Sequence, residues 1–194
     1  MSRLVFLLEE PSMRTLLEGL LPRLFPDLRF LCLAHQGKQD LERSLPRKLR
    51  CWQEPGVRFV VVRDNDGADC KTVKASLDTL CRDAGRQDTL VRIACQELEA
   101  WYLGDPEGLA KAWADEGLRR LGRRERFRDP DAVVRPSKAL AELVPAFQKV
   151  SGARRMAPIL DPERNTSRSF RAFVTGVRRL AASATVAPPE REES

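Results

Sequence analysis

The sequence predicts an α/β protein in which helices flank a mainly parallel sheet of about four strands. Short apolar runs alternate with amphipathic segments of helical length, which is the pattern of βαβ units. The run Phe59–Val62 contains no charge and is followed by several aspartates. Such a run suits a strand covered on both faces, as at the centre of a parallel sheet.

The first half of the chain supplies all the predicted strands. Apolar spacing predicts strands over residues 4–8, 28–34, 59–62 and 89–95, with helices over residues 13–24, 40–52 and 73–81. Pro22 falls inside the first helical pattern, so we expect that helix to end or kink there. Connections in such units are right-handed, so the carboxyl ends of the strands gather at one edge of the sheet, called the carboxyl edge below.

The second half has a different composition. Residues 1–104 form the predicted α/β domain, and residues 105–182 a helical, basic extension packed on it. Six arginines fall between positions 119 and 128, and further helical patterns begin at Pro136 and continue to Leu180. Residues 183–194, with two prolines and three glutamates, predict a disordered tail.

Composition restricts the class of protein. The chain has 194 residues and a formal net charge of +6, which favours a polyanionic partner. Its five cysteines have no C-x-x-C spacing and are typical of reduced thiols rather than a disulfide framework or a zinc site. The amino-terminal apolar run is too short for a signal peptide, and no window reaches the length of a membrane span. We expect a cytoplasmic protein without membrane contact.

Acidic residues follow two of the predicted strands. Asp64 and Asp66 come directly after the central strand, and Glu9 closes the first one. Ligands of open α/β sheets bind just outside the carboxyl ends of the strands, so we expect these carboxylates to meet there, with Glu97 beside them. Carboxylate oxygens are ligands for Mg²⁺ or Mn²⁺. The alternative is a solvated turn, because D-x-D-G is also good turn chemistry.

These residues carry a resemblance to a known family. A Glu after the first strand and D-x-D after a later one, in a small parallel sheet, resemble the TOPRIM fold of topoisomerases, primases and the overcoming-lysogenization-defect nucleases. More closely, the chain resembles a bacterial domain-of-unknown-function family of small TOPRIM-like proteins, often encoded beside an ATPase. That similarity extends to about Leu180 and rests on E-E-P-S-M, H-Q-G-K, R-D-N-D, C-Q-E-L-E-A-W-Y-L-G-D, K-V-S-G-A-R-R and S-R-S-F.

The resemblance implies roles for the acids. Asp64 and Asp66 become ligands of Mg²⁺ or Mn²⁺, and Glu9 a ligand or an acid/base catalyst. Glu97 is a further metal ligand, and Glu10 and Glu99 are supporting or alternative ligands, so one or two metals are compatible with the sequence. Glu97 and Glu99 are also good first-turn residues of a helix, whose dipole favours acids.

Cationic and polar residues near these motifs are candidate phosphate contacts. Arginine forks and lysine ammonium groups are the usual partners of phosphate oxygens. Internal pairing with the acids, or an ordinary loop or surface position, is the alternative for several of them. The candidates are His35, Lys38, Arg63, Lys149, Arg154, Arg155 and Arg168.

Two functions follow from the sequence and the resemblance. The first is a divalent-metal-dependent nuclease, or related phosphodiester-cleaving enzyme, acting on nucleic acid, in a defence system with a partner ATPase. The second is a non-cleaving subunit that binds nucleic acid or an ATPase and holds a structural or regulatory metal. Glu10 and Met13, which stand where the nuclease branch has Gly and Glu, favour the second. A toxin-like enzyme acting on nucleotides or transfer RNA is a third possibility, and a homodimer is compatible with the sequence.

Overall fold

The computed structural model describes residues 3–185, and its centre is a four-stranded sheet in which every strand runs parallel to its neighbours. The spatial order is β2-β1-β3-β4. The four strands are β1 (Arg3–Leu8), β2 (Phe30–Ala34), β3 (Val57–Asp64) and β4 (Leu90–Ala94). The predicted α/β class and parallel sheet are therefore confirmed.

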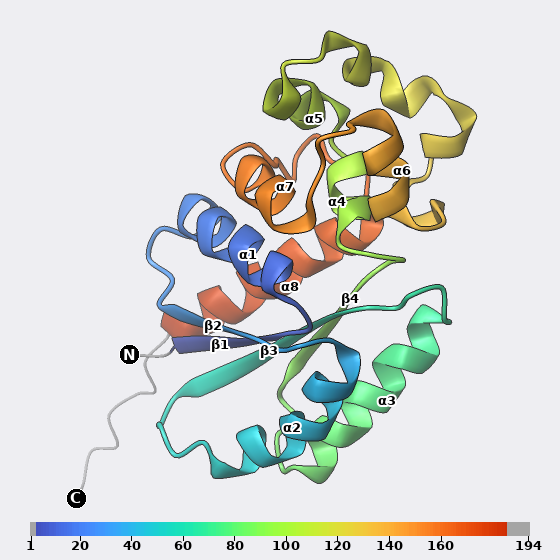
Figure 1. The fold of residues 1–194 in the computed structure, drawn as a ribbon. Coiled ribbons are helices and arrows are strands. Elements are labelled where there is room, and N and C mark those ends of the chain that lie inside the picture. The colour runs from blue at the N-terminus through green and yellow to red at the C-terminus, as the bar shows by residue number, and fades with distance from the viewer. Residues whose placement is uncertain (1–2, 186–194) are drawn as a thin grey trace, which may run out of the picture.

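Helices cover both faces of this sheet (Figure 1). Helices α2 (Lys38–Cys51) and α3 (Cys70–Asp83) lie on one face, and α1 (Pro11–Leu24) and α8 (Arg168–Thr185) lie on the other. Alternate residues of β1 supply the two cores: Leu4, Phe6 and Leu8 face α1 and α8, while Val5 and Leu7 face α2 and α3. This explains why strand residues are apolar without alternation, since both faces are buried.

The remaining helices stack beyond the α1 and α8 face (Figure 1). They are α4 (Glu99–Leu103), α5 (Pro106–Trp113), the 3₁₀ helices η1 (Glu116–Arg123), η2 (Glu125–Phe127) and η3 (Pro130–Ala132), α6 (Pro136–Leu143) and α7 (Lys149–Met156). They share one core with α1 and α8, to which Trp101, Phe170 and Phe173 contribute fully buried rings. The last helix thus returns from the helical half to complete a layer on the sheet.

Two expectations about helix ends are corrected. Pro22 does not end α1, which continues to Leu24, because a proline in the last turn removes only one intrahelical bond. The predicted tail begins too early, since α8 runs to Thr185, and the rest of that tail lies outside the described residues. No helix within residues 3–185 is long and apolar enough to cross a membrane.

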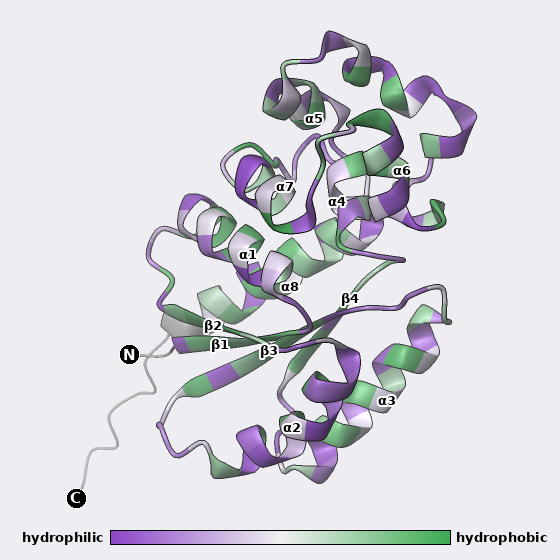
Figure 2. Ribbon diagram, viewed as in Figure 1, coloured by the Kyte–Doolittle hydropathy of each residue, from purple (hydrophilic) through white to green (hydrophobic). Residues whose placement is uncertain are grey.

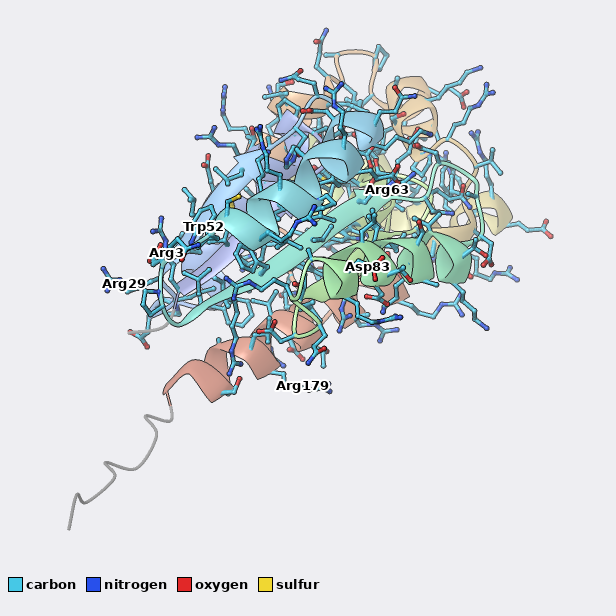
Figure 3. The ribbon with its side chains drawn as sticks, turned by 90° about the horizontal axis from the view of Figure 1, so that it is seen from below. Arg3, Arg29, Trp52, Arg63, Asp83 and Arg179 are labelled. Atoms are coloured by element: carbon cyan, nitrogen blue, oxygen red, sulfur yellow. The ribbon has the colours of Figure 1, made fainter. Side chains whose placement is uncertain are left out.

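The connections place a crevice at one edge of the sheet. The chain leaves β1 through α1 toward β2, then crosses through α2 on the opposite face to reach β3. Strands β1 and β3 are therefore neighbours whose following helices diverge, and ligands of doubly wound sheets bind at such a point. Figure 3 shows Arg63, near the end of β3, far from Arg3 and Trp52 at the opposite edge.

Candidate active site at the carboxyl edge

Glu9 and Asp64 lie together at this crevice. The Glu9 carboxylate accepts a hydrogen bond from the Asp64 backbone N–H at 3.1 Å, and the Glu9 N–H donates to Val62 O at 3.2 Å. Glu9 is 8% exposed and Asp64 is 3% exposed. Residues that are 55 positions apart in the chain are thus held side by side by the pairing of β1 with β3.

The side chains of Asp64 and Asp66 separate. Asp64 ends β3 and is buried, whereas Asp66 is exposed on the following loop, where its carboxylate pairs with the Lys38 ammonium at 2.8 Å. Asp66 has φ +50°, and its N–H donates to the carbonyl of Gln96, which has φ +65°. Left-handed backbone at two facing non-glycine residues is a local strain, and such strain concentrates at functional sites.

Three carboxylates form what we call the acid cluster: Glu10, Asp64 and Glu99. Glu10 immediately precedes α1, and Glu99 is the first residue of α4, so three separate elements contribute. The pKa of Asp64 is raised well above its usual value by burial and then by Glu10, Glu9 and Glu99. The pKa of Glu99 is raised to about 7, again chiefly by burial.

Lys149 is the cation nearest the acid cluster. Its ammonium lies 3.1 Å from one Glu10 oxygen and 3.9 Å from a Glu99 oxygen. Burial alone would lower the pKa of Lys149, but Glu99 and Glu10 outweigh burial and leave that pKa raised. Lys149 therefore stays charged and neutralises part of the cluster.

Several buried polar atoms in or near the acid cluster have no hydrogen-bond partner among the described residues. They are Asp64 Oδ1, both carboxylate oxygens of Glu99, and the hydroxyl of Tyr102, which lies one turn beyond Glu99 on α4. The pKa of Tyr102 is raised by burial and by the nearby carboxylates, beginning with Glu99. Tyr102 was not anticipated from the sequence, although its i, i+3 spacing from Glu99 places both side chains on one helix face.

Arg63 and His35 are engaged inside the protein. The Arg63 guanidinium pairs with Glu42 of α2 at 2.5 Å and lies 3.7 Å from Glu9. His35 is buried, with Nδ1 2.8 Å from the Leu8 carbonyl and Nε2 2.6 Å from the Lys48 ammonium. These contacts correspond to internal pairing rather than to a free phosphate contact.

The remaining candidates lie at several different places. Glu97 accepts from the Ser137 N–H at 2.7 Å and so caps the start of α6. Arg155 donates to the Ala112 carbonyl, and Arg168 pairs with Asp129 at 2.8 Å. Arg154 is exposed on α7. Of the predicted phosphate contacts, Lys149 alone pairs with the acid cluster within residues 3–185.

Fold and site together define a doubly wound α/β protein with buried acids at the carboxyl edge of its sheet. A family model described as "Domain of unknown function (DUF4276)" matches residues 8–178. The chain therefore belongs to this family, which confirms the expected membership of a domain-of-unknown-function family. The match runs from the last residue of β1 into α8, so it includes the other three strands and the helices that contribute to the site. No match was found among curated proteins or among solved structures.

Proposed function

We propose that the protein is a divalent-metal-dependent enzyme that cleaves phosphodiester bonds in nucleic acid, with the acid cluster as its metal site. The observation that carries this proposal is the set of buried oxygens on Asp64 and Glu99 that have no hydrogen-bond partner among the described residues. A buried polar atom without a partner costs about 1–3 kcal/mol, and more if charged. A protein can keep such a destabilising group where a bound ligand offsets its cost. The resemblance to TOPRIM nucleases suggests that this ligand is Mg²⁺ or Mn²⁺.

The donor set suits such an ion chemically. Carboxylate oxygens are hard ligands, and like charges packed together repel unless a cation intervenes. Within residues 3–185 no group of three or more Asp, Glu, His or Cys side chains already stands in a metal-holding arrangement. Because Lys149 pairs with Glu10, we infer that the ammonium withdraws when a metal binds. Glu10, Asp64 and Glu99 would then have to move closer together to hold the ion.

The chain's own groups have distinct tasks in this proposal. A bound divalent ion would activate water and neutralise phosphate charge. Glu9 orients the end of β3 through its bond to the Asp64 N–H, and its pKa is raised by burial, which suits it to accept or return a proton. The displaced Lys149 ammonium would contact a phosphate oxygen, and the Asp66–Lys38 pair lies near Glu9.

Nucleic acid is the proposed substrate because exposed arginines gather on the helical half. The segment from η1 to η2 is largely hydrophilic in Figure 2. Of the six arginines between positions 119 and 128, Arg119 and Arg126 pair with glutamates. The other four arginines have no ion-pair partner in the part of the chain that the structure describes. Unpaired arginines on an exposed surface fit a phosphate backbone. Those four are Arg120, Arg123, Arg124 and Arg128.

The second candidate is a non-cleaving subunit that binds nucleic acid or an ATPase. The observation that favours it is Lys149, whose ammonium already supplies positive charge to Glu10 and Glu99. In that case the cluster would be a structural ion pair or a regulatory cation site, and nucleic acid would bind without turnover.

The variant Asp64→Asn tests the proposed cleavage activity. Wild type is incubated with plasmid DNA or RNA and Mg²⁺ or Mn²⁺, beside this variant and the control Asp78→Asn, which alters only a surface pair with Lys74. Loss of several kcal/mol of transition-state stabilisation predicts a rate at least about 100-fold lower for Asp64→Asn. Equal cleavage by both variants would refute the proposal. Tight nucleic-acid binding in calorimetry without cleavage by wild type would favour the second candidate.

The arginine segment is tested by salt dependence. Each phosphate contact contributes about 0.9 to the slope of log affinity against log salt concentration. Replacing the four unpaired arginines by glutamine should therefore reduce that slope by up to about 3.6 and leave the cleavage rate at saturating DNA unchanged. The control replaces Arg43, Arg47 and Arg50 of α2, which covers the other face of the sheet. Equal slopes for both variants would exclude the segment as a phosphate contact.

A further inference from the structure

Two cysteines meet beside the carboxyl edge. Cys70 is the first residue of α3 and Cys95 directly follows β4, 25 positions later, yet their Sγ atoms are 3.2 Å apart. Both are free thiols and both are partly exposed. The other three cysteines are either buried, as Cys32 and Cys81 are, or exposed, as Cys51 is.

Hydrogen bonds of the surrounding backbone hold the segments that carry the two thiols close together. The Asp66 N–H donates to the Gln96 carbonyl at 3.0 Å, and the Gln96 N–H donates to the Asn65 side chain. The Cys95 N–H donates to the Ser169 hydroxyl at 3.3 Å. The loop after β3 and the segment after β4 are therefore already tied together by two hydrogen bonds at Gln96, and Cys95 is tied separately to α8.

A cavity of about 480 Å³ gives access to Cys95. Its wall includes Lys74, Arg92 and Arg168, together with Asp131, whose oxygens accept bonds from serines of the α8 amino terminus. Each of these cations is already engaged, Lys74 with Asp78, Arg168 with Asp129, and Arg92 with the carbonyls of Val91 and Ala172. The cavity therefore offers a small molecule space beside Cys95 rather than a free positive charge.

We propose that Cys70 and Cys95 form a reversible disulfide on exposure to a small disulfide such as oxidised glutathione. A disulfide requires an S–S distance of about 2.05 Å, so the sulfurs must approach by roughly 1 Å, which side-chain rotation supplies. The bond would link the Asp66 loop covalently to the segment that leads into Glu97 and Glu99. This inference does not depend on the nuclease proposal.

Each step of this thiol–disulfide exchange forms one S–S bond and breaks another. Cys70, deprotonated by solvent, attacks one sulfur of oxidised glutathione, and the first glutathione leaves as a thiolate. Cys95 then loses its proton, attacks the Cys70 sulfur and releases the second glutathione. Burial raises the pKa of the Cys95 thiol to about 12, which is consistent with Cys95 acting second. One disulfide is reduced as one protein disulfide forms.

The experiment uses the full chain with Cys51→Ser, which removes the exposed thiol and leaves the pair intact. After incubation with excess oxidised glutathione, free thiols are alkylated and the chain is mapped by mass spectrometry. We expect an intramolecular link between the peptides containing Cys70 and Cys95, reversed by dithiothreitol, and a Tm higher by about 5 °C. In the additional variants Cys70→Ser and Cys95→Ser the link should be absent and the remaining thiol should carry glutathione.

Three results would overturn the proposal. All four thiols remaining free, glutathione adducts without an internal link, or a link between other cysteines would each show that the 3.2 Å contact is ordinary packing. Because the readout is a covalent bond, it is unaffected by whether the protein cleaves nucleic acid.

Discussion

Replacing Lys149 by methionine tests the acid cluster most directly. The substitution keeps the length of the aliphatic side chain and removes the single positive charge that pairs with Glu10 and Glu99 within residues 3–185. We expect the free energy of unfolding to fall in the absence of divalent metal, because three neighbouring carboxylates would then lack a counter-charge.

The magnitude follows from burial. Breaking a fully buried ion pair costs about 3–5 kcal/mol, and an exposed pair contributes about 0–1 kcal/mol. The side chain of Lys149 is 40% exposed and that of Glu10 is 22% exposed, so the pair lies between these limits. A loss of about 2 kcal/mol is expected, which lowers the Tm by about 4–8 °C for a chain of this size.

Metal should reverse this loss. At a concentration 100 times its Kd, a ligand that binds only the folded state contributes about 2.7 kcal/mol, enough to restore the variant. Wild type should gain less, since metal must there displace the ammonium. The assay is thermal unfolding with and without Mg²⁺ at matched ionic strength, and Arg154→Met on the same helix is the control because Arg154 is exposed.

Two results would refute this reasoning. If Lys149→Met is as stable as wild type, the ion pair with Glu10 does not contribute to the folded state. If Mg²⁺ stabilises the variant no more than it stabilises wild type or the Arg154→Met control, the acid cluster does not bind the ion.

Two other predictions concern buried groups outside the cluster. Burial lowers the pKa of His35 below its usual value of 6.5, so the unfolded chain binds more protons just below pH 6.5 and stability falls as pH falls through that range. The variant His35→Gln should therefore show a smaller decline in the free energy of unfolding between about pH 7.5 and pH 5. A decline equal to that of wild type would contradict this prediction. Asp105, 0% exposed, pairs with Arg164 at 2.6 Å, so Asp105→Asn should cost about 2–3 kcal/mol in denaturant unfolding. The control is Asp161→Asn, because Asp161 is the more exposed partner of Arg164, and its cost should be about 1 kcal/mol or less. Equal costs for Asp105→Asn and Asp161→Asn would contradict the argument from burial.

The sheet could be predicted from sequence because its signals are local. Each strand is an apolar run, such as Val60–Val62, and each βαβ connection has only one favoured hand. Proximity of Glu9 and Asp64 then follows from strand pairing alone. The return of α8 to cover the sheet could not be predicted in this way, because its apolar face, through Phe173 and Val177, fits any large apolar surface.

The composition of the acid cluster also lies beyond local signals. Strand-end reasoning favours Glu9 and Asp66, but the turn at Asp66 takes its side chain outward to Lys38. Glu99 lies near Asp64 because it follows β4, the strand paired with β3, whereas Lys149 approaches from the start of α7, which lies far along the chain. The position of Lys149 depends on packing between elements that are distant in the sequence.

A comparison within the molecule supports a ligand at the acid cluster. Asp131 is buried, and its carboxylate accepts bonds from the Ser167 hydroxyl and from the N–H and hydroxyl of Ser169 at the start of α8. Asp105, also buried, accepts from two backbone N–H groups and from Arg164. The fold therefore satisfies buried carboxylates where their role is structural, as buried polar groups require. Asp64 Oδ1 and both Glu99 oxygens lack a hydrogen-bond partner among the described residues, and Glu99 has only the 3.9 Å ion pair with Lys149. That difference is the reason for proposing a metal at this cluster and not at Asp131 or Asp105.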